Sequence, residues 1–178
     1  MAIRTILQSK ISGGDEKSDA FLHTATNTVE NMTEEIQQII QDLKDTLWAY
    51  PFCVGLSAPQ IGIPYSISVI NTTRDSPESS QVIINPRIIS LSGKKDRKRE
   101  SCMSVWGEMG EVERRDKLVL EYRDERFDLK EISYTGFLSR AVQHELDHLS
   151  GVLYSDKLYQ NTDLQHANFF DEYSIIEE

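Results

Sequence analysis

The stretch "RAVQHELDHLSG", Arg140 to Gly151, places two histidines four residues apart, with a glutamate directly after the first. Residues four apart lie on one face of a helix, so His144 and His148 can bind one metal ion together. Glu145 lies beside this pair, where it can accept a proton from a water molecule at the metal. The H-E-x-x-H pattern is typical of zinc hydrolases, and two exposed histidines on a surface helix are the alternative interpretation.

A hydrolytic metal site also needs a third protein ligand and an open position for water. We favour Cys102, because a thiolate is a strong ligand for zinc and for ferrous iron. The alternative for Cys102 is a small buried hydrophobic side chain, which is the usual role of a lone cysteine. His166 is the second choice of ligand, and the other downstream candidates are Asp156, Asp163, Asp171, Glu172, Glu177 and Glu178.

The bulk composition describes an ordinary globular protein, with 178 residues of which 39% are hydrophobic and 27% charged. We expect a single domain, residues 1–178. Nineteen basic and 29 acidic residues give a net charge of −10, which argues against direct nucleic-acid binding and against docking on an anionic membrane. No apolar run approaches the ~18 residues of a membrane span, and the start does not resemble a secretory signal. Cys53 and Cys102 are therefore expected to be reduced thiols in a cytoplasmic protein.

Residues 31–50, "NMTEEIQQIIQDLKDTLWAY", carry apolar side chains at the spacing of a helix that packs one face on a core. Asn31 and Glu34 predict a capping box at its start, and Pro51 predicts its end. A second helix is expected after Gly136, running through the two histidines.

Short strands are predicted between these helices. One covers residues 65–71 after an irregular, Gly- and Pro-rich loop, and "QVIINP" (81–86) forms another that ends at its proline. Polar loops are expected at 72–80 and at the basic run "KKDRKR" (94–99). The alternation in residues 116–134 predicts a hairpin that turns at Asp124 to Arg126. Strands gathered before and between two main helices predict the α+β class.

Three segments carry a family resemblance: "VGLSAPQIG" (54–62), "ESCMS" (100–104) and "QHELDHLSG" (143–151). They occur in the order and approximate spacing of the three motifs of peptide deformylase, and the chain resembles that family over most of its length. The resemblance implies an α+β fold with mixed or antiparallel strands around a central metal-binding helix. It also implies one divalent metal, natively ferrous iron, with zinc, nickel and cobalt as alternatives.

The resemblance assigns roles to individual residues. Cys102, His144 and His148 bind the metal, and Glu145 is the general base and then the general acid. The side-chain amide of Gln60 and the backbone N–H of Met103 are the donors to the developing oxyanion. From its residues alone, the favoured interpretation of Gln60 is a loop glutamine that caps the backbone.

The resemblance also implies the substrate, which is the N-formylmethionyl end of a newly made protein. Gly55 binds the substrate main chain and Leu56 belongs to the same strand-like edge. Val54, Ala141 and Phe137 are candidates for the wall of the methionine pocket, although their spacing also fits ordinary core. Arg140 either lines the pocket mouth or pairs with a carboxylate. A transient contact with the ribosome fits this substrate, but the acidic tail is unlike the basic C-terminal helix through which some members dock there.

Four positions depart from the usual motifs: Cys53 and Ser101 replace glycines, Ser57 replaces an alanine, and Trp106 replaces a proline. They motivate one alternative, a divergent member with an altered substrate or little deformylase activity. A second alternative is a zinc endopeptidase, which leaves the cysteine and glutamine motifs unexplained.

Overall fold

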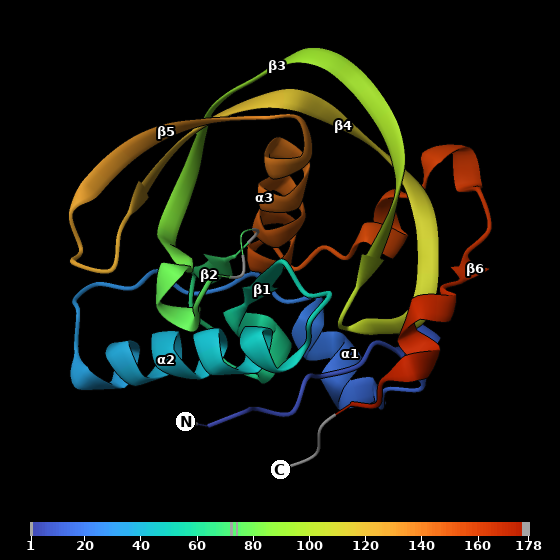
Figure 1. The fold of residues 1–178 in the computed structure, drawn as a ribbon, viewed down its shortest axis with the longest axis horizontal. Helices are drawn as coiled ribbons and strands as arrows, with labels where there is room; N and C mark the ends of the chain where they lie inside the picture. Colours follow the sequence, from blue (N-terminus) through green and yellow to red (C-terminus); the bar gives the residue numbers. More distant parts are fainter. Residues whose placement is uncertain (1, 72, 74, 176–178) are drawn as a thin grey trace.

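The computed structural model describes residues 2–71, 73 and 75–175, and its centre is one antiparallel sheet that curves around a helix. Five strands pair in sequence order and a sixth pairs with the fourth: β1 (Gly55–Ser57), β2 (Ile67–Ile70), β3 (Gln81–Cys102), β4 (Val105–Arg123), β5 (Leu129–Thr135) and β6 (Gln165–His166). The long strands β3 and β4 arch over helix α3 (Gly136–Leu149), as Figure 1 shows. The α+β class and the central helix predicted from the sequence are confirmed.

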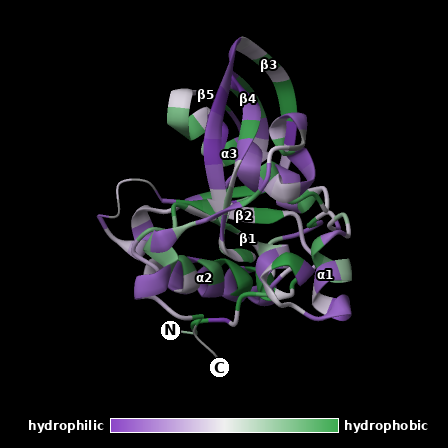
Figure 2. Cartoon of the chain, turned by 90° about the vertical axis from the view of Figure 1, so that its right-hand side faces the viewer, coloured by the Kyte–Doolittle hydropathy of each residue, from purple (hydrophilic) through white to green (hydrophobic). Residues whose placement is uncertain are grey.

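Two further helices, α1 (Glu16–Leu22) and α2 (Glu34–Ala49), lie on the other side of β1 and β2 from α3. The apolar stripe of α2 is buried against the sheet, where Leu43 and Leu47 meet Leu56 and Val69. A second core cluster joins α3 to β3, β4 and β5. Figure 2 shows the hydrophobic strand β2 between α2 and α3. In the described part of the chain, no helix has both the length and the hydropathy to cross a membrane.

The prediction that Pro86 ends a short strand is wrong, because β3 continues through it to Cys102. The pairing register with β4 shifts between Ile84 and Arg87, and Asn85 has a φ of 48°. Such a bulge leaves proline's missing N–H without consequence for the ladder. Asn85 is held there by its side chain, which accepts from Val29 N and donates to Val29 O.

The basic run at 94–99 also lies within β3, so its prediction as a loop is wrong. Its backbone pairs with β4, and Lys95 forms an ion pair with Glu113 across the two strands at 2.6 Å. Main-chain pairing does not depend on side-chain polarity, so an exposed strand can be as highly charged as a loop.

Most of the other predicted elements are confirmed. The helix predicted over residues 31–50 is α2, and the helix predicted after Gly136 is α3. The strand predicted over residues 65–71 is β2, and the predicted turn after Arg123 joins β4 to β5. The Gly- and Pro-rich loop contains β1 and a 3₁₀ helix, η2 (Ala58–Ile61). Part of the polar loop at 72–80 forms the 3₁₀ helix η3 (Pro77–Ser79), while residues 72 and 74 lie outside the described part. The remaining 3₁₀ helices are η1 (Lys10–Ser12), η4 (Tyr154–Lys157), η5 (Tyr159–Asn161) and η6 (Asn168–Glu172).

The cap of α2 differs from the prediction. Thr33, and not Asn31, is the N-cap residue, and its side-chain oxygen accepts a hydrogen bond from Ile36 N at 3.2 Å.

We expect Thr33→Ala to lower the free energy of unfolding by about 1 kcal/mol, the usual value of one such cap. Asn31→Ala is the matched control and should leave it unchanged in urea unfolding followed by circular dichroism. Equal effects of the two changes would contradict this assignment.

Candidate active site

The three predicted metal ligands come together inside the molecule. The ligand atoms of Cys102, His144 and His148 all lie within 4.8 Å of one another. Cys102 Sγ is 3.3 Å from His148 Nε2, and the two imidazole centroids are 5.0 Å apart. His166 lies elsewhere, exposed on β6 and 2.9 Å from Asp171. Among the described residues this is the one such group, and the candidate ligands Glu177 and Glu178 lie outside them.

The fold explains why these residues meet. Cys102 is the last residue of β3, and Ser104 N in the following turn donates to its sulfur at 3.3 Å. His144 and His148 lie one turn apart on α3, which the arch of β3 and β4 encloses. The end of β3 therefore places the sulfur of Cys102 against one face of α3, where it meets His148 Nε2.

A buried ion network centred on Glu100 orients this group. Glu100 accepts a hydrogen bond from His144 Nδ1 at 3.0 Å and two from Arg114, both at 2.7 Å. Arg140 Nη1 donates to the same carboxylate, and Arg114 also pairs with Asp147. Because Nδ1 of His144 is engaged by Glu100, Nε2 is the ring nitrogen that can bind a metal.

The charges in this group are set by its partners. Burial alone would raise the pKa of Glu100, but hydrogen bonds from Arg114 and His144 hold that pKa well below its usual range. Burial would lower the pKa of His144, but hydrogen bonds to Cys102 and Glu100 raise that pKa well above its ordinary value. Burial and the nearby His144 lower the pKa of His148 well below its ordinary value, which favours the neutral imidazole that can act as a ligand.

These properties fit a metal ion. The site offers one sulfur and two imidazole nitrogens at short mutual distances, beside the carboxylate of Glu100. Such a mixed set suits zinc or ferrous iron.

Glu145 lies next to this group but does not belong to it. Its side chain is buried against β1, where Ser57 Oγ donates to Glu145 Oε2 at 2.7 Å. Its other oxygen, Oε1, lies over Gly55, and a Cβ on that glycine would come within 2.5 Å of it. Burial raises the pKa of Glu145, opposed by His144 and by the hydrogen bond from Ser57. A carboxylate with a raised pKa is suited to proton transfer near neutral pH.

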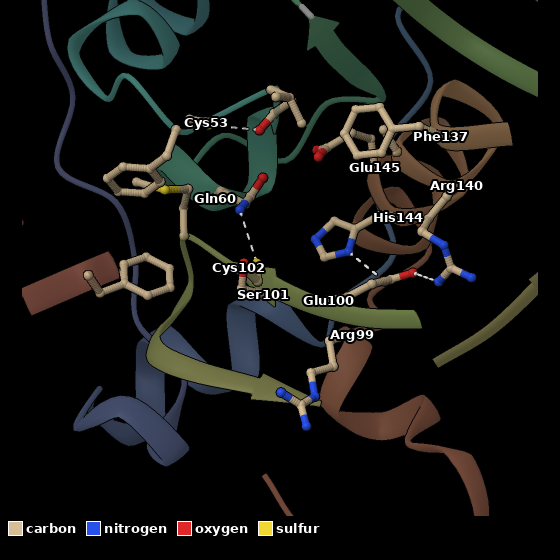
Figure 3. A pocket seen from close by; sticks show the side chains of 16 residues that line it. Cys53, Gln60, Arg99, Glu100, Ser101, Cys102, Phe137, Arg140, His144 and Glu145 are labelled. Atoms are coloured by element: carbon tan, nitrogen blue, oxygen red, sulfur yellow. Dashed lines mark hydrogen bonds and ion pairs between the residues drawn. The ribbon is translucent and has the colours of Figure 1, made fainter. Parts of the chain in front are cut away.

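Gln60 is buried in η2 with its side-chain amide fixed at both ends. Its Oε1 accepts from Ser57 N at 2.9 Å, while its Nε2 lies 3.5 Å from Cys102 Sγ and 3.3 Å from Ser104 Oγ. Gln60 thus caps the backbone, as one interpretation of the sequence predicts, and also directs its NH₂ toward the ligand cysteine (Figure 3). Met103 follows that cysteine and is held by Gln8, whose side chain donates to Met103 O at 2.8 Å.

A cavity of about 230 Å³ opens beside these groups. Its lining includes most of the residues predicted to contact substrate: Val54, Gly55, Arg140, Ala141 and Phe137. Leu56 is not among them, because it is fully buried in the core under α2. The guanidinium of Arg140 is turned to Glu100 (Figure 3), so the carboxylate-pairing interpretation describes its main contact.

Some residues of the site were not assigned a role from the sequence. Glu100 lies in the segment "ESCMS", two residues before Cys102. Because alternate residues of a strand share a face, this spacing could have indicated that Glu100 points to the same side as the ligand cysteine. Phe52, Arg99 and Phe170 also line the cavity. Phe170 belongs to η6 near the end of the chain, and no local pattern predicts that this segment returns to the site.

The four departures from the usual motifs lie in three different environments. Cys53 and Ser101 line the cavity. Trp106 packs instead on Tyr50 and Phe170, with ring centroids at 5.9 and 4.6 Å. Ser57 is fully buried and contacts Glu145, so it does not narrow the cavity.

Comparison with known proteins agrees with this geometry. Residues 15–163 match the family model for polypeptide deformylase. A peptide deformylase of Prochlorococcus marinus is 34% identical over 90% of this chain and 81% of its own, and one of Chlorobaculum parvum is 35% identical over 79% and 76%. The crystal structure of a Legionella pneumophila peptide deformylase superposes with a TM-score of 0.80 at 35% identity, covering 89% of this chain and 88% of that one. The crystal structure of a Synechococcus elongatus peptide deformylase in complex with actinonin superposes with a TM-score of 0.77 at 30% identity, covering 88% of this chain and 80% of that one. The chain therefore belongs to the polypeptide deformylase family.

Proposed function

We propose that this protein removes the formyl group from the N-terminal formylmethionine of newly made proteins. The observation that carries the proposal is the convergence on one cavity of the Cys102, His144 and His148 group with the carboxylate of Glu145 and the amide of Gln60. In the reaction, the oxygen of water bonds to the formyl carbon and the C–N bond breaks, releasing formate and a free amine.

The ligands of the divalent metal in this proposal are Cys102, His144 and His148, and the native metal is ferrous iron, with zinc, nickel and cobalt as substitutes. When bound, the metal supplies a Lewis acid and lowers the pKa of a water molecule. The sulfur donor supports iron or zinc over magnesium or calcium, which prefer oxygen ligands.

Glu145 carries the proton in this mechanism. Its buried carboxylate accepts a proton from the attacking water and then delivers it to the leaving amine. Oε1 is the working oxygen, because Oε2 is occupied by Ser57 and Oε1 lies over the cavity-lining Gly55.

Two neutral donors stabilise the oxyanion that develops on the formyl group. The Nε2 of Gln60 is held toward the cavity by the bond between its own Oε1 and Ser57 N. The N–H of Met103 follows the ligand cysteine, and Met103 lines the same cavity. Donors fixed before the reaction need no reorganisation as charge develops.

The cavity accepts the methionine side chain, with Val54, Met103 and Ala141 among its walls. Gly55 leaves space for the substrate main chain beside Glu145, and Leu56 supports this edge from the core. Arg140 acts through Glu100 in this proposal. The protein acts in the cytoplasm as a single domain on formyl-Met nascent peptides and contacts the ribosome only transiently.

The proposal is tested with protein purified anaerobically with ferrous iron and incubated with formyl-Met-Ala-Ser or with casein. Free amine from the formyl peptide and no cleavage of casein are expected. Cleaved casein would support an endopeptidase, and neither product would support a member that has lost deformylation.

Cys102→Ala should remove most of the bound metal, because one of three ligands is lost. His166→Ala is the matched control and should retain about one metal ion per chain by elemental analysis. Unchanged metal in the cysteine variant would move the third ligand elsewhere.

Glu100→Gln should weaken metal binding by roughly 10- to 100-fold, because His144 loses the carboxylate that fixes its ring. Competition with a chelator measures this affinity. Glu113→Gln, which breaks a partly exposed ion pair with Lys95 on the same hairpin, should have no effect. An affinity within threefold of the starting protein would show that Glu100 does not orient the ligand.

Gln60→Leu should lower kcat/KM by roughly 10²- to 10³-fold with the metal retained, the usual effect of losing one oxyanion donor. Steady-state kinetics on the formyl peptide measures the change. Activity within about threefold would remove Gln60 from the mechanism.

Glu145→Gln should bind metal fully yet lose activity by roughly 10⁴-fold or more, because the amide cannot accept the proton and the same group must later protonate the amine. Metal content and kcat are measured on one preparation. Loss of metal would make Glu145 a ligand, and activity within tenfold would remove it as the base.

A further inference from the structure

We infer that Ser57, supported by Ser68, is a positioning residue that fixes the orientation of the Glu145 carboxylate. Ser57 Oγ lies 2.7 Å from Glu145 Oε2 and 2.7 Å from Ser68 Oγ. Both serines are fully buried, and they are direct partners in the pairing of β1 with β2. The inference rests on the proposed function, in which Glu145 transfers the proton.

The available hydrogens give this chain one direction. The ionised carboxylate of the base only accepts. It lies closer to Ser57 Oγ than the backbone oxygen of Glu145 does, at 2.7 Å against 3.2 Å, so the single hydroxyl hydrogen of Ser57 points to the carboxylate. The hydroxyl of Ser68 then donates to Ser57, which still has acceptor capacity. Each donor in such a chain polarises the next, so Ser68 strengthens the bond that Ser57 makes to the carboxylate.

The contact separates the two oxygens of Glu145. Oε2 is held by Ser57, away from the cavity lining, whereas Oε1 lies against Gly55, which is part of that lining. Rotation of the carboxylate would break a charge-assisted hydrogen bond in a fully buried place, and among the described residues Ser57 is the one donor to Oε2. The serine therefore keeps one oxygen toward the reacting atoms through every turnover.

Backbone geometry explains why position 57 can do this. Gly55 and Ser57 are two residues apart on β1, so both face α3, and the carboxylate of Glu145 spans the distance between them. Ser57 itself does not line the cavity, so a change there reaches the substrate site only through Glu145, which does line it.

The experiment compares Ser57→Ala, Ser68→Ala and the double variant, each loaded with ferrous iron. We expect Ser57→Ala to lower kcat roughly tenfold, a fraction of the effect of losing the base, with KM and metal content within about twofold. Ser68 is equally buried but is one hydrogen bond further from Glu145, so Ser68→Ala should lower kcat less than threefold. The double variant should match Ser57→Ala, because Ser68 acts only through Ser57.

Crystal structures of the metal-loaded variants give a readout that does not depend on activity. In Ser57→Ala the Glu145 carboxylate should turn or become disordered while the three metal ligands stay in place. If Ser57→Ala folds poorly because it leaves the Ser68 hydroxyl unpaired, the double variant, which has no orphan hydroxyl, provides the same comparison.

Three results would overturn the inference. These are an unchanged kcat with an unmoved carboxylate, equal losses in the two single variants, and a loss in Ser57→Ala confined to KM or metal content. If the unsubstituted protein does not deformylate, the proposed function fails, and the crystallographic comparison still decides whether Ser57 positions Glu145.

Discussion

The buried carboxylate of Glu100 is the interaction on which the rest of the site depends. It joins β3 to Arg114 on β4 and to Arg140 and His144 on α3, so a single group ties the arch to the helix inside it. Burying a charge costs several kcal/mol unless it is fully paired, and here its oxygens meet three cationic or hydrogen-bonding partners. Such a network contributes little net stability compared with an apolar core of equal volume, but it ties the end of β3 to α3 and β4 through directional hydrogen bonds.

That placement determines the chemistry. With α3 fixed against the end of β3, the histidines meet the sulfur of Cys102, and Glu145, on a neighbouring face of the helix, meets β1. The catalytic groups therefore come from three separate segments. Their mutual distances follow from the packing of helix on sheet rather than from flexible loops.

The sequence predicted the parts of this arrangement that are local. The spacing of His144 and His148, the glutamate between them and the amphipathic pattern of α2 are properties of short segments, and the motifs around Gln60 and Cys102 supplied the rest through a family resemblance. The parts that failed depend on distant partners. Pro86 was predicted to end a strand. The bulge that accommodates it depends on the hydrogen bond between Asn85 and Val29, which is far away in the chain and cannot be inferred from the local sequence. The cap of α2 was misplaced by two residues, since Asn31 and Thr33 are both good capping residues and only the backbone decides between them. The Glu100 network was missed because Arg114 and α3 reach it through tertiary structure alone.

The contact between Gly55 and Glu145 has a consequence for how this sequence can change over evolutionary time. The catalytic carboxylate occupies the space that a side chain would take, so every possible replacement at position 55 adds at least one carbon where an oxygen already lies. While Glu145 keeps its place, no substitution at position 55 is therefore neutral. Ser57, two residues further on, differs: losing its hydroxyl removes its hydrogen bonds to Glu145 and Ser68 but introduces no collision. One short strand thus contains both a position at which drift is forbidden and a position at which drift can proceed in small steps.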